Sequence, residues 1–133
     1  MFEWKETYSV GIKEIDEQHK RLFEIGREVS DLLGLYGVKD VKEEVNLSIE
    51  SLIDYTKYHF EFEEKLMEKY SYPDLKIHKE EHLDFVENII NLKNELEEGH
   101  EIDVILGSMA FIAEWIFKHI AKSDAEYSRH INK

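Results

Sequence analysis

The sequence predicts an all-α protein: an up-down-up-down antiparallel four-helix bundle with an N-terminal arm. Three observations lead to this prediction. Apolar residues recur at alternating spacings of three and four along four long stretches of the chain. Residues that break helices are scarce, with six glycines and one proline among 133 residues. The connections between the stretches are short, which makes consecutive helices antiparallel neighbours.

The chain is expected to form one domain over residues 1–133, made of an arm (1–15) and a bundle (16–133). Its length suits a single domain, and it contains no linker, repeat or low-complexity tract. The arm lacks helical periodicity but contains several large apolar residues, so we expect it to pack along the bundle. These residues are Phe2, Trp4, Tyr8, Val10 and Ile12.

The first helix is expected from about Asp16 to Leu33, ended by Gly34 and Gly37. Its inward positions alternate four and three apart, and they are Ile15, His19, Leu22, Gly26, Val29 and Leu33. This spacing is typical of helices that pack nearly parallel to one another.

The second helix is expected to open at Asp40, because Glu43 follows three residues later in a pattern close to a capping box. Its inward positions continue the same alternation. They are Val41, Val45, Ser48, Leu52, Tyr55, His59, Phe62 and Leu66.

Pro73 suits the start of the third helix and Gly99 its end, while the fourth helix begins near Ile102. The inward positions of the third helix are Leu75, His78, His82, Phe85, Ile89, Leu92 and Leu96. Those of the fourth are Ile105, Met109, Ile112, Ile116 and His119.

Composition excludes several classes of function. A formal net charge of −13 disfavours nucleic acid and anionic membrane surfaces as partners. The absence of cysteine excludes disulfides, thiolate metal ligands and cysteine nucleophiles. The N-terminus has no signal-peptide pattern, and no run approaches the ~18 apolar residues of a membrane span. We therefore expect a soluble, cytoplasmic protein.

Five of the seven histidines fall on inward positions: His19, His59, His78, His82 and His119. Burying so much imidazole in one small core costs free energy unless something binds it. A metal centre is the economical explanation. The other two, His100 in a polar turn and His130 among polar in-phase neighbours, are expected to be exposed.

Two carboxylates accompany the inward histidines. Glu63 follows His59 by four residues, as His82 follows His78, so each pair shares one helix face. Asp124 follows His119 by five residues, which leaves the two about 140° apart on an ideal α-helix. A local widening such as a π-bulge would turn Asp124 inward. The spacing alone leaves Asp124 as a plausible ligand only.

Position along the helices supports a single site. In an up-down bundle, the first and third helices start at the end where the second and fourth finish. At a rise of ~1.5 Å per residue, the candidate ligands of the first three helices lie roughly 5–16 Å from the same end of the bundle. His119 and Asp124 lie in the same band if the fourth helix runs to about His130. Side chains from all four helices therefore meet at one level.

These residues resemble the haemerythrin family, specifically its bacterial single-domain form. The similar segments span nearly the whole chain and read SVGIKEIDEQHK, HFEFEEKLM, HKEEH and WIFKHIAKSD. A lone HxxxH would be weak, but a histidine followed in order by HxxxE, HxxxH and HxxxxD is highly specific. The five-residue gap before Asp124 is the family's own spacing, so the resemblance makes Asp124 a ligand.

The resemblance also implies the cofactor and its ligand set. Two iron ions (Fe²⁺/Fe³⁺) would be bridged by Glu63, Asp124 and an oxo or hydroxo group. One iron would be bound by His78, His82 and His119, and the other by His19 and His59. If both irons are octahedral, these ligands fill every position except one, on the iron with two histidines. An open position on reduced iron is what dioxygen binding requires.

Apolar residues are expected to wall the oxygen pocket beside that open position. They are Phe60, Trp115, Ile116 and Ile120. Such a wall would keep water and protons away, and none of the four carries a hydroxyl, amine or carboxylate. Other carboxylates nearby lie off the inward faces and are expected to be solvated, namely Glu61, Glu64, Glu80 and Glu81.

Reversible dioxygen binding for storage, delivery or scavenging is the expected function, without catalysis. The partner would be dioxygen, with an electron donor or oxygen-consuming enzyme still unidentified. A di-iron oxidase, peroxidase or nitric oxide reductase is disfavoured, because five neutral histidines and two carboxylates stabilise high-valent iron poorly. An oxygen or redox sensor is disfavoured because no output domain follows the bundle. Metal storage and a zinc site are further alternatives.

Overall fold

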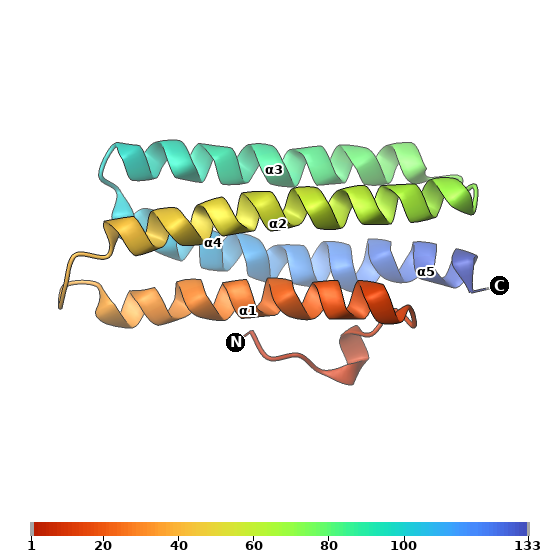
Figure 1. The fold of residues 1–133 in the computed structure, drawn as a ribbon, viewed down its shortest axis with the longest axis horizontal. Helices are drawn as coiled ribbons and strands as arrows, with labels where there is room; N and C mark the ends of the chain where they lie inside the picture. The colour runs from red at the N-terminus through yellow and green to blue at the C-terminus, as the bar shows by residue number, and fades with distance from the viewer. Residues whose placement is uncertain (1, 133) are drawn as a thin grey trace.

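The computed structural model describes residues 2–132, which form four helical rods in antiparallel order along one long axis (Figure 1). The first three rods are α1 (Lys13–Leu35), α2 (Lys42–Lys69) and α3 (Leu75–Glu97). The fourth is continuous and comprises α4 (Glu101–Trp115), the π-helical segment η2 (Ile116–Asp124) and α5 (Ala125–Ile131). The arm contains one short 3₁₀ helix, η1 (Glu6–Tyr8). No strand occurs among the described residues, and the all-α bundle prediction is confirmed.

The rods enclose a continuous apolar core. α1 packs against α2 and α4, and α3 packs against the same two helices, so that sequential neighbours lie side by side. Each rod contributes fully buried side chains, such as Ile25, Ile49, Phe85 and Ile112. The alternating spacing of the sequence produces this core because it keeps one stripe of each helix apolar.

The buried stripe of α2 differs from the predicted one. Val45, Leu52 and His59 are buried as expected, but between them the structure buries a different set of residues: Ile49, Thr56, Glu63 and Met67 replace Ser48, Tyr55, Phe62 and Leu66. From Val45 the predicted alternation takes a step of three first, whereas the buried residues take a step of four first, which also includes Glu63, already predicted to share a face with His59. The polar Thr56 can lie inside the bundle because its hydroxyl donates a hydrogen bond to the Leu52 carbonyl at 2.8 Å.

The arm is attached to the bundle by the residue that the sequence placed at the helix start. α1 begins at Lys13, three residues before Asp16. The Asp16 carboxylate accepts hydrogen bonds from the arm instead, from the Ser9 hydroxyl at 2.5 Å and the Val10 N–H at 2.8 Å. The Ser128 hydroxyl donates to the Val10 carbonyl, so the arm also joins α5.

Phe2 lies inside the protein, only 2% exposed, against α1. A Cβ added at Gly26 would lie 2.7 Å from Cδ1 of the Phe2 ring, closer than real contacts allow. The Arg27 guanidinium donates to the Phe2 carbonyl at 2.5 Å. Gly26 therefore provides the space that the Phe2 ring occupies.

The observed helix boundaries agree with the predicted ones only in part. α1 runs through Gly34 to Leu35, so Gly34 does not end it, and the left-handed φ of +86° falls on Gly37. Gly99 follows α3 with a φ of +90° and its N–H bonds back to the Leu96 carbonyl, as expected for a terminating glycine. α2 begins at Lys42 rather than at the predicted Asp40, with Val41 at the N-cap, and the Asp40 carboxylate accepts the Lys42 N–H at 3.0 Å.

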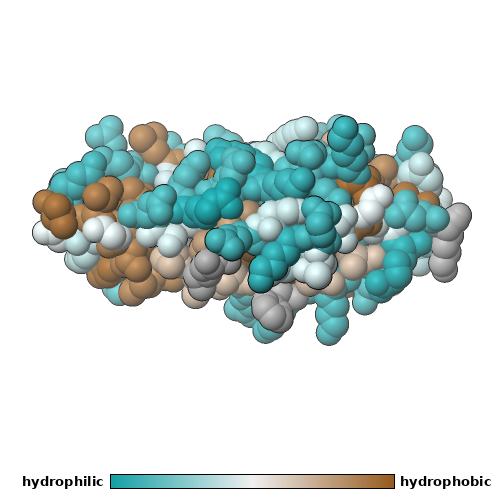
Figure 2. Space-filling model, turned by 90° about the horizontal axis from the view of Figure 1, so that it is seen from below, coloured by the Kyte–Doolittle hydropathy of each residue, from teal (hydrophilic) through white to brown (hydrophobic). Residues whose placement is uncertain are grey.

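The fourth rod has a further property that the sequence analysis missed. By length and composition alone, Glu101–Ile131 is apolar enough to cross a membrane. The core helix of a soluble bundle passes the same test, and this rod packs against α1 and α3. Figure 2 shows mostly hydrophilic side chains on one face of the molecule, with apolar ones gathered at one end. Leu35, Tyr36 and Val38 are exposed where α1 leads into α2.

Candidate metal centre

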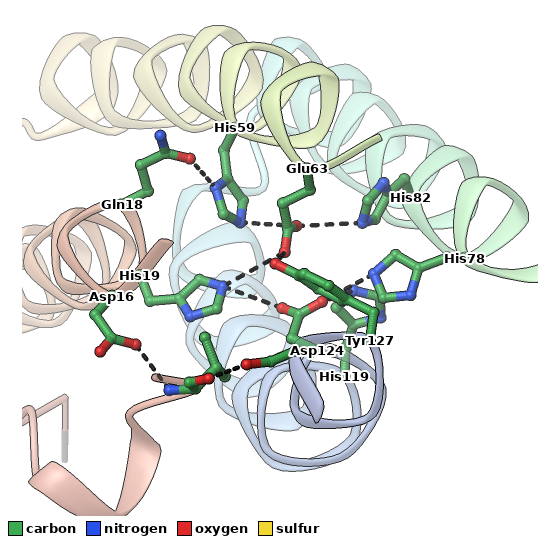
Figure 3. Close-up of polar contacts among 12 residues, drawn as sticks. Asp16, Gln18, His19, His59, Glu63, His78, His82, His119, Asp124 and Tyr127 are labelled. Atoms are coloured by element: carbon green, nitrogen blue, oxygen red, sulfur yellow. Dashed lines mark hydrogen bonds and ion pairs between the residues drawn. The ribbon is translucent and has the colours of Figure 1, made fainter. Parts of the chain in front are cut away.

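The structure brings together all seven predicted ligands, and every rod contributes (Figure 3). His19 comes from α1, and the other six come in pairs from the remaining rods: His59 and Glu63 from α2, His78 and His82 from α3, His119 and Asp124 from η2. All seven side chains are buried. They form two overlapping groups able to hold a metal ion, in which the donor atoms lie within 4.8 Å of one another. One group is Glu63, His78, His82, His119 and Asp124, and the other is His19, His59, Glu63 and Asp124.

The π-helical segment explains how Asp124 reaches the site. η2 spans Ile116–Asp124, so the whole interval from His119 to Asp124 is wider than an α-helix. In a π-helix the hydrogen bonds join residues five apart, so a five-residue step returns to the same face. Nε2 of His119 consequently lies 3.1 Å from Oδ1 of Asp124. The predicted local widening is confirmed.

Each buried carboxylate faces histidines of both groups. Oδ1 of Asp124 lies 2.8 Å from Nε2 of His78, and its Oδ2 lies 3.0 Å from Nε2 of His19. Oε1 of Glu63 lies 2.9 Å from Nε2 of His59 and 3.5 Å from Nε2 of His82. Glu63 and Asp124 therefore stand where carboxylates bridging two metal ions would stand.

Several of these donor atoms are buried with no hydrogen-bond partner among the described residues: Nε2 of His19, His82 and His119, Oε1 of Glu63 and Oδ2 of Asp124. Leaving a buried polar atom unsatisfied costs about 1–3 kcal/mol. Imidazole and carboxylate together suit first-row transition metals, iron included. The residues therefore fit a pair of bound metal ions, which would satisfy the unpaired atoms.

Three histidine ligands have an outer partner at their second ring nitrogen. Oε1 of Gln18 lies 2.6 Å from Nδ1 of His59. Oε2 of Glu64 lies 2.8 Å from Nδ1 of His82, and Oε2 of Glu81 lies 2.5 Å from Nδ1 of His119. Such partners fix the ring and its tautomer, leaving Nε2 for a metal.

The expectation that Glu64 and Glu81 are solvated was wrong. Their side chains are only 26% and 38% exposed, whereas Glu61 and Glu80 are exposed as predicted. Glu64, Glu81 and Gln18 each stand next to a ligand in the sequence, and this adjacency is the signal that could have found them. A residue beside a ligand points about 100° away on its own helix, so it reaches a ligand of a neighbouring helix.

Tyr127 is a further residue that the sequence analysis missed. Its phenol donates to Oε2 of Glu63 at 2.5 Å, and both side chains are buried. Tyr127 follows Asp124 by three residues, a spacing that places both on one side of a helix. That spacing would have been the signal.

The buried carboxylates and imidazoles shift one another's pKa values. Burial and the charge of Asp124 raise the pKa of Glu63, but His59 and His82 outweigh them and hold it below its usual value. Burial raises the pKa of Asp124, and His119 with the other facing imidazoles holds it well below normal. Burial lowers the pKa of His119, yet Asp124 and Glu81 raise it to about 10. Both carboxylates are ionised, and protons compete with metal for the imidazoles.

The four residues predicted to wall an oxygen pocket lie close to the site in different ways. Phe60 stacks on the His82 ring with centroids 3.9 Å apart, and Trp115 stacks on His119 at 3.8 Å. The two aromatic rings thus cover ligands of the three-histidine group. Ile116 and Ile120 are buried in the adjoining core. Whether the four residues wall the open position beside His19 and His59 stays a prediction.

The remaining two histidines lie outside the site. His100 is exposed, as predicted. His130 is half-buried rather than exposed, because its Nε2 lies 3.0 Å from the Tyr70 carbonyl and its ring packs against Tyr72.

A four-helix bundle with these two overlapping ligand groups in its core defines a class of helical protein with a candidate site for two metal ions. Sequence comparisons make the class specific. The chain belongs to the haemerythrin family, whose model, described as the Hemerythrin HHE cation binding domain, matches residues 10–131.

Individual relatives extend over nearly the whole chain. A bacteriohemerythrin of Clostridium acetobutylicum is 33% identical over 130 residues, covering 96% of this chain and 98% of the relative. A bacteriohemerythrin of Stenotrophomonas maltophilia is 30% identical, covering 96% of this chain and 80% of the relative. A myohemerythrin of Theromyzon tessulatum is 31% identical, covering 95% of this chain and 90% of the relative.

Proposed function

We propose that this protein binds dioxygen reversibly at a di-iron centre, for oxygen storage, delivery or scavenging. The observation that carries the proposal is the position of Glu63 and Asp124, each facing histidines of both groups. Membership of the haemerythrin family supports it, because this is a family of di-iron, oxygen-binding proteins.

The side chains divide the work of such a centre. His78, His82 and His119 would hold one iron and His19 and His59 the other, while the two ionised carboxylates would offset the metal charge. When bound, the iron pair supplies an open position at which dioxygen can bind and leave. Phe60, Trp115, Ile116 and Ile120 would exclude water, which limits oxidation of the irons.

We further propose that the protein is a cytoplasmic carrier rather than an enzyme. The small number of carboxylates supports this, since Glu63 and Asp124 alone stabilise high-valent iron poorly beside five neutral imidazoles. One observation favours a di-iron peroxidase or nitric oxide reductase as the second candidate. The Tyr127 phenol donates a hydrogen bond to Oε2 of Glu63 and so places a hydroxyl group inside the centre, where reactions that consume protons need polar groups.

Iron analysis and one spectroscopic cycle test the proposal. The full chain, expressed with ample iron and reduced without air, should contain two irons and be colourless. Air should produce a visible absorption band, and vacuum should remove it, over repeated cycles without added reductant. One iron per chain, or zinc at full occupancy, would contradict the di-iron centre. Continuous oxygen consumption with a reductant, at a rate matching turnover of added peroxide or nitric oxide, would establish the enzyme instead.

A further inference from the structure

The outer partners of the ligand histidines differ in charge between the two ligand groups. In the three-histidine group, Nδ1 of His119 lies 2.5 Å from Oε2 of Glu81, and Nδ1 of His82 lies 2.8 Å from Oε2 of Glu64. An ionised carboxylate can only accept a hydrogen bond, so Nδ1 carries the proton and Nε2 is left as the donor atom for a metal. Two negative charges therefore support this group from outside.

The two-histidine group has no such support. Nδ1 of His59 lies 2.6 Å from Oε1 of Gln18, a neutral amide that fixes the ring but adds no charge. Nδ1 of His19 is buried and has no hydrogen-bond partner within residues 2–132. Figure 3 shows this side of the site, with Gln18 against His59 and His19 reaching toward Asp124.

The number of donor atoms also favours the three-histidine group. Five side chains meet around the first position and four around the second, and the two positions share Glu63 and Asp124. A carboxylate hydrogen-bonded to a ligating imidazole makes the ring a stronger donor, and losing such an outer partner costs about 10–100-fold in metal affinity. Glu64 and Glu81 are partly exposed, so solvent weakens their charge at a distance, but each makes a direct charge-assisted hydrogen bond.

We propose that the two metal positions are unequal, and that Glu64 and Glu81 are positioning residues responsible for the difference. The position of His78, His82 and His119 fills first and retains its ion. The position of His19 and His59 fills second and exchanges its ion more readily. This inference rests on the proposed two-metal centre but not on oxygen binding.

The order of filling can be measured on the full metal-free chain with Zn²⁺, a diamagnetic probe of both positions. Calorimetry gives the two dissociation constants, and NMR of the histidine rings identifies which histidines bind at each step. The first equivalent should shift the rings of His78, His82 and His119, and the second those of His19 and His59, with affinities at least about tenfold apart. Filling in the reverse order, or all five rings shifting in parallel, overturns the inference.

Conservative variants distinguish the effect of the outer carboxylates on metal affinity from the effect of the protein's net charge. Glu81→Gln and Glu64→Gln keep a hydrogen-bond acceptor and lose the charge. Each should therefore lower the affinity for the first equivalent of Zn²⁺ about 10–100-fold. Glu80→Gln is the matched control, because Glu80 is exposed and adjacent to Glu81, and it should change neither constant. Equal weakening by Glu80→Gln and Glu81→Gln would overturn the inference, since only net charge would then matter.

A reciprocal variant tests the other position. Gln18→Glu places a carboxylate against Nδ1 of His59 and should raise the affinity for the second equivalent of Zn²⁺. The two dissociation constants should then lie closer together. Denaturant unfolding of each metal-free variant checks that the bundle is intact. If Zn²⁺ does not bind at all, the metal centre itself is refuted. If two ions bind with equal affinity, only the inequality proposed here is refuted.

Discussion

The Tyr127 phenol and the Glu63 carboxylate form a buried hydrogen bond of 2.5 Å that joins α5 to α2. Burial, together with the neighbouring Glu63 and Asp124 charges, raises the pKa of Tyr127 well above its usual value, so the phenol keeps its proton. The hydroxyl therefore serves as a donor to the carboxylate that faces both histidine groups. We expect this hydrogen bond to stabilise the bundle, and we expect the carboxylate that accepts it to contribute to metal affinity.

Tyr127→Phe should destabilise the metal-free protein by about 1–3 kcal/mol, because Oε2 of Glu63 loses its donor inside the bundle. Urea unfolding followed by circular dichroism measures the change. Tyr72→Phe is the control, since the half-buried Tyr72 ring packs against Tyr127 and lies outside the ligand groups. Equal free energies of unfolding for the two variants would show that the bond to Glu63 contributes nothing.

Glu63→Ala should lower the affinity for iron by at least about tenfold, since it removes a carboxylate that faces both histidine groups. Iron per chain after dialysis against a chelator measures the loss. Glu61→Ala, two residues away on the exposed side of α2, should retain both irons, as should His100→Ala. Iron loss in either control, with retention in Glu63→Ala, would refute the ligand assignment.

Ile116→Ala should accelerate oxidation of the reduced, iron-loaded protein in air without lowering its iron content, because water would enter the enlarged pocket. The cavity should also cost roughly 2–5 kcal/mol of stability. Ile105→Ala is a matched control, since Ile105 is also buried but lies in α4, about 21 Å along the rod from His119. Comparable oxidation rates in the two variants would show that Ile116 is ordinary core.

Gly26→Ala should destabilise the bundle by about 1–3 kcal/mol, because the new methyl group would overlap the Phe2 ring. In a Phe2→Ala background the same change should cost nothing or stabilise the helix, and a double-mutant cycle gives the coupling. Gly34→Ala, which has open space around it, should stabilise α1 by roughly 0.5–1 kcal/mol. A similar cost at Gly26 with and without Phe2 would show that the arm does not require the glycine.

Sequence spacing predicted which candidate ligands share a helix face, because a helix converts spacing into direction. His59 with Glu63 and His78 with His82 are one turn apart, so their shared faces follow from the helix itself. The five-residue step to Asp124 required a wider turn, and η2 provides it. Local geometry was therefore sufficient for residues whose partners lie in their own helix.

The outer residues could not be predicted in the same way. Gln18, Glu64 and Glu81 each contact a ligand on a different helix, so their contacts depend on how the rods are rotated against one another. Asp16 has the sequence character of a helix cap, but its carboxylate binds the arm. Adjacency to a ligand marks Gln18, Glu64 and Glu81 as candidates, but which ligand each one contacts depends on tertiary packing, which residue spacing does not encode.

The π-helical segment makes the fourth rod unusual in its response to a change of length. Deleting one residue from an ordinary α-helix turns every later side chain by about 100° relative to the earlier ones. In η2 the exposed Lys122 lies between His119 and Asp124, and its deletion would leave those two four residues apart, as His59 and Glu63 are. The segment could then close into a regular α-helix with Asp124 and Tyr127 still directed inward. This interval of the rod is one where a helix can be shortened by a residue while its inward face is preserved.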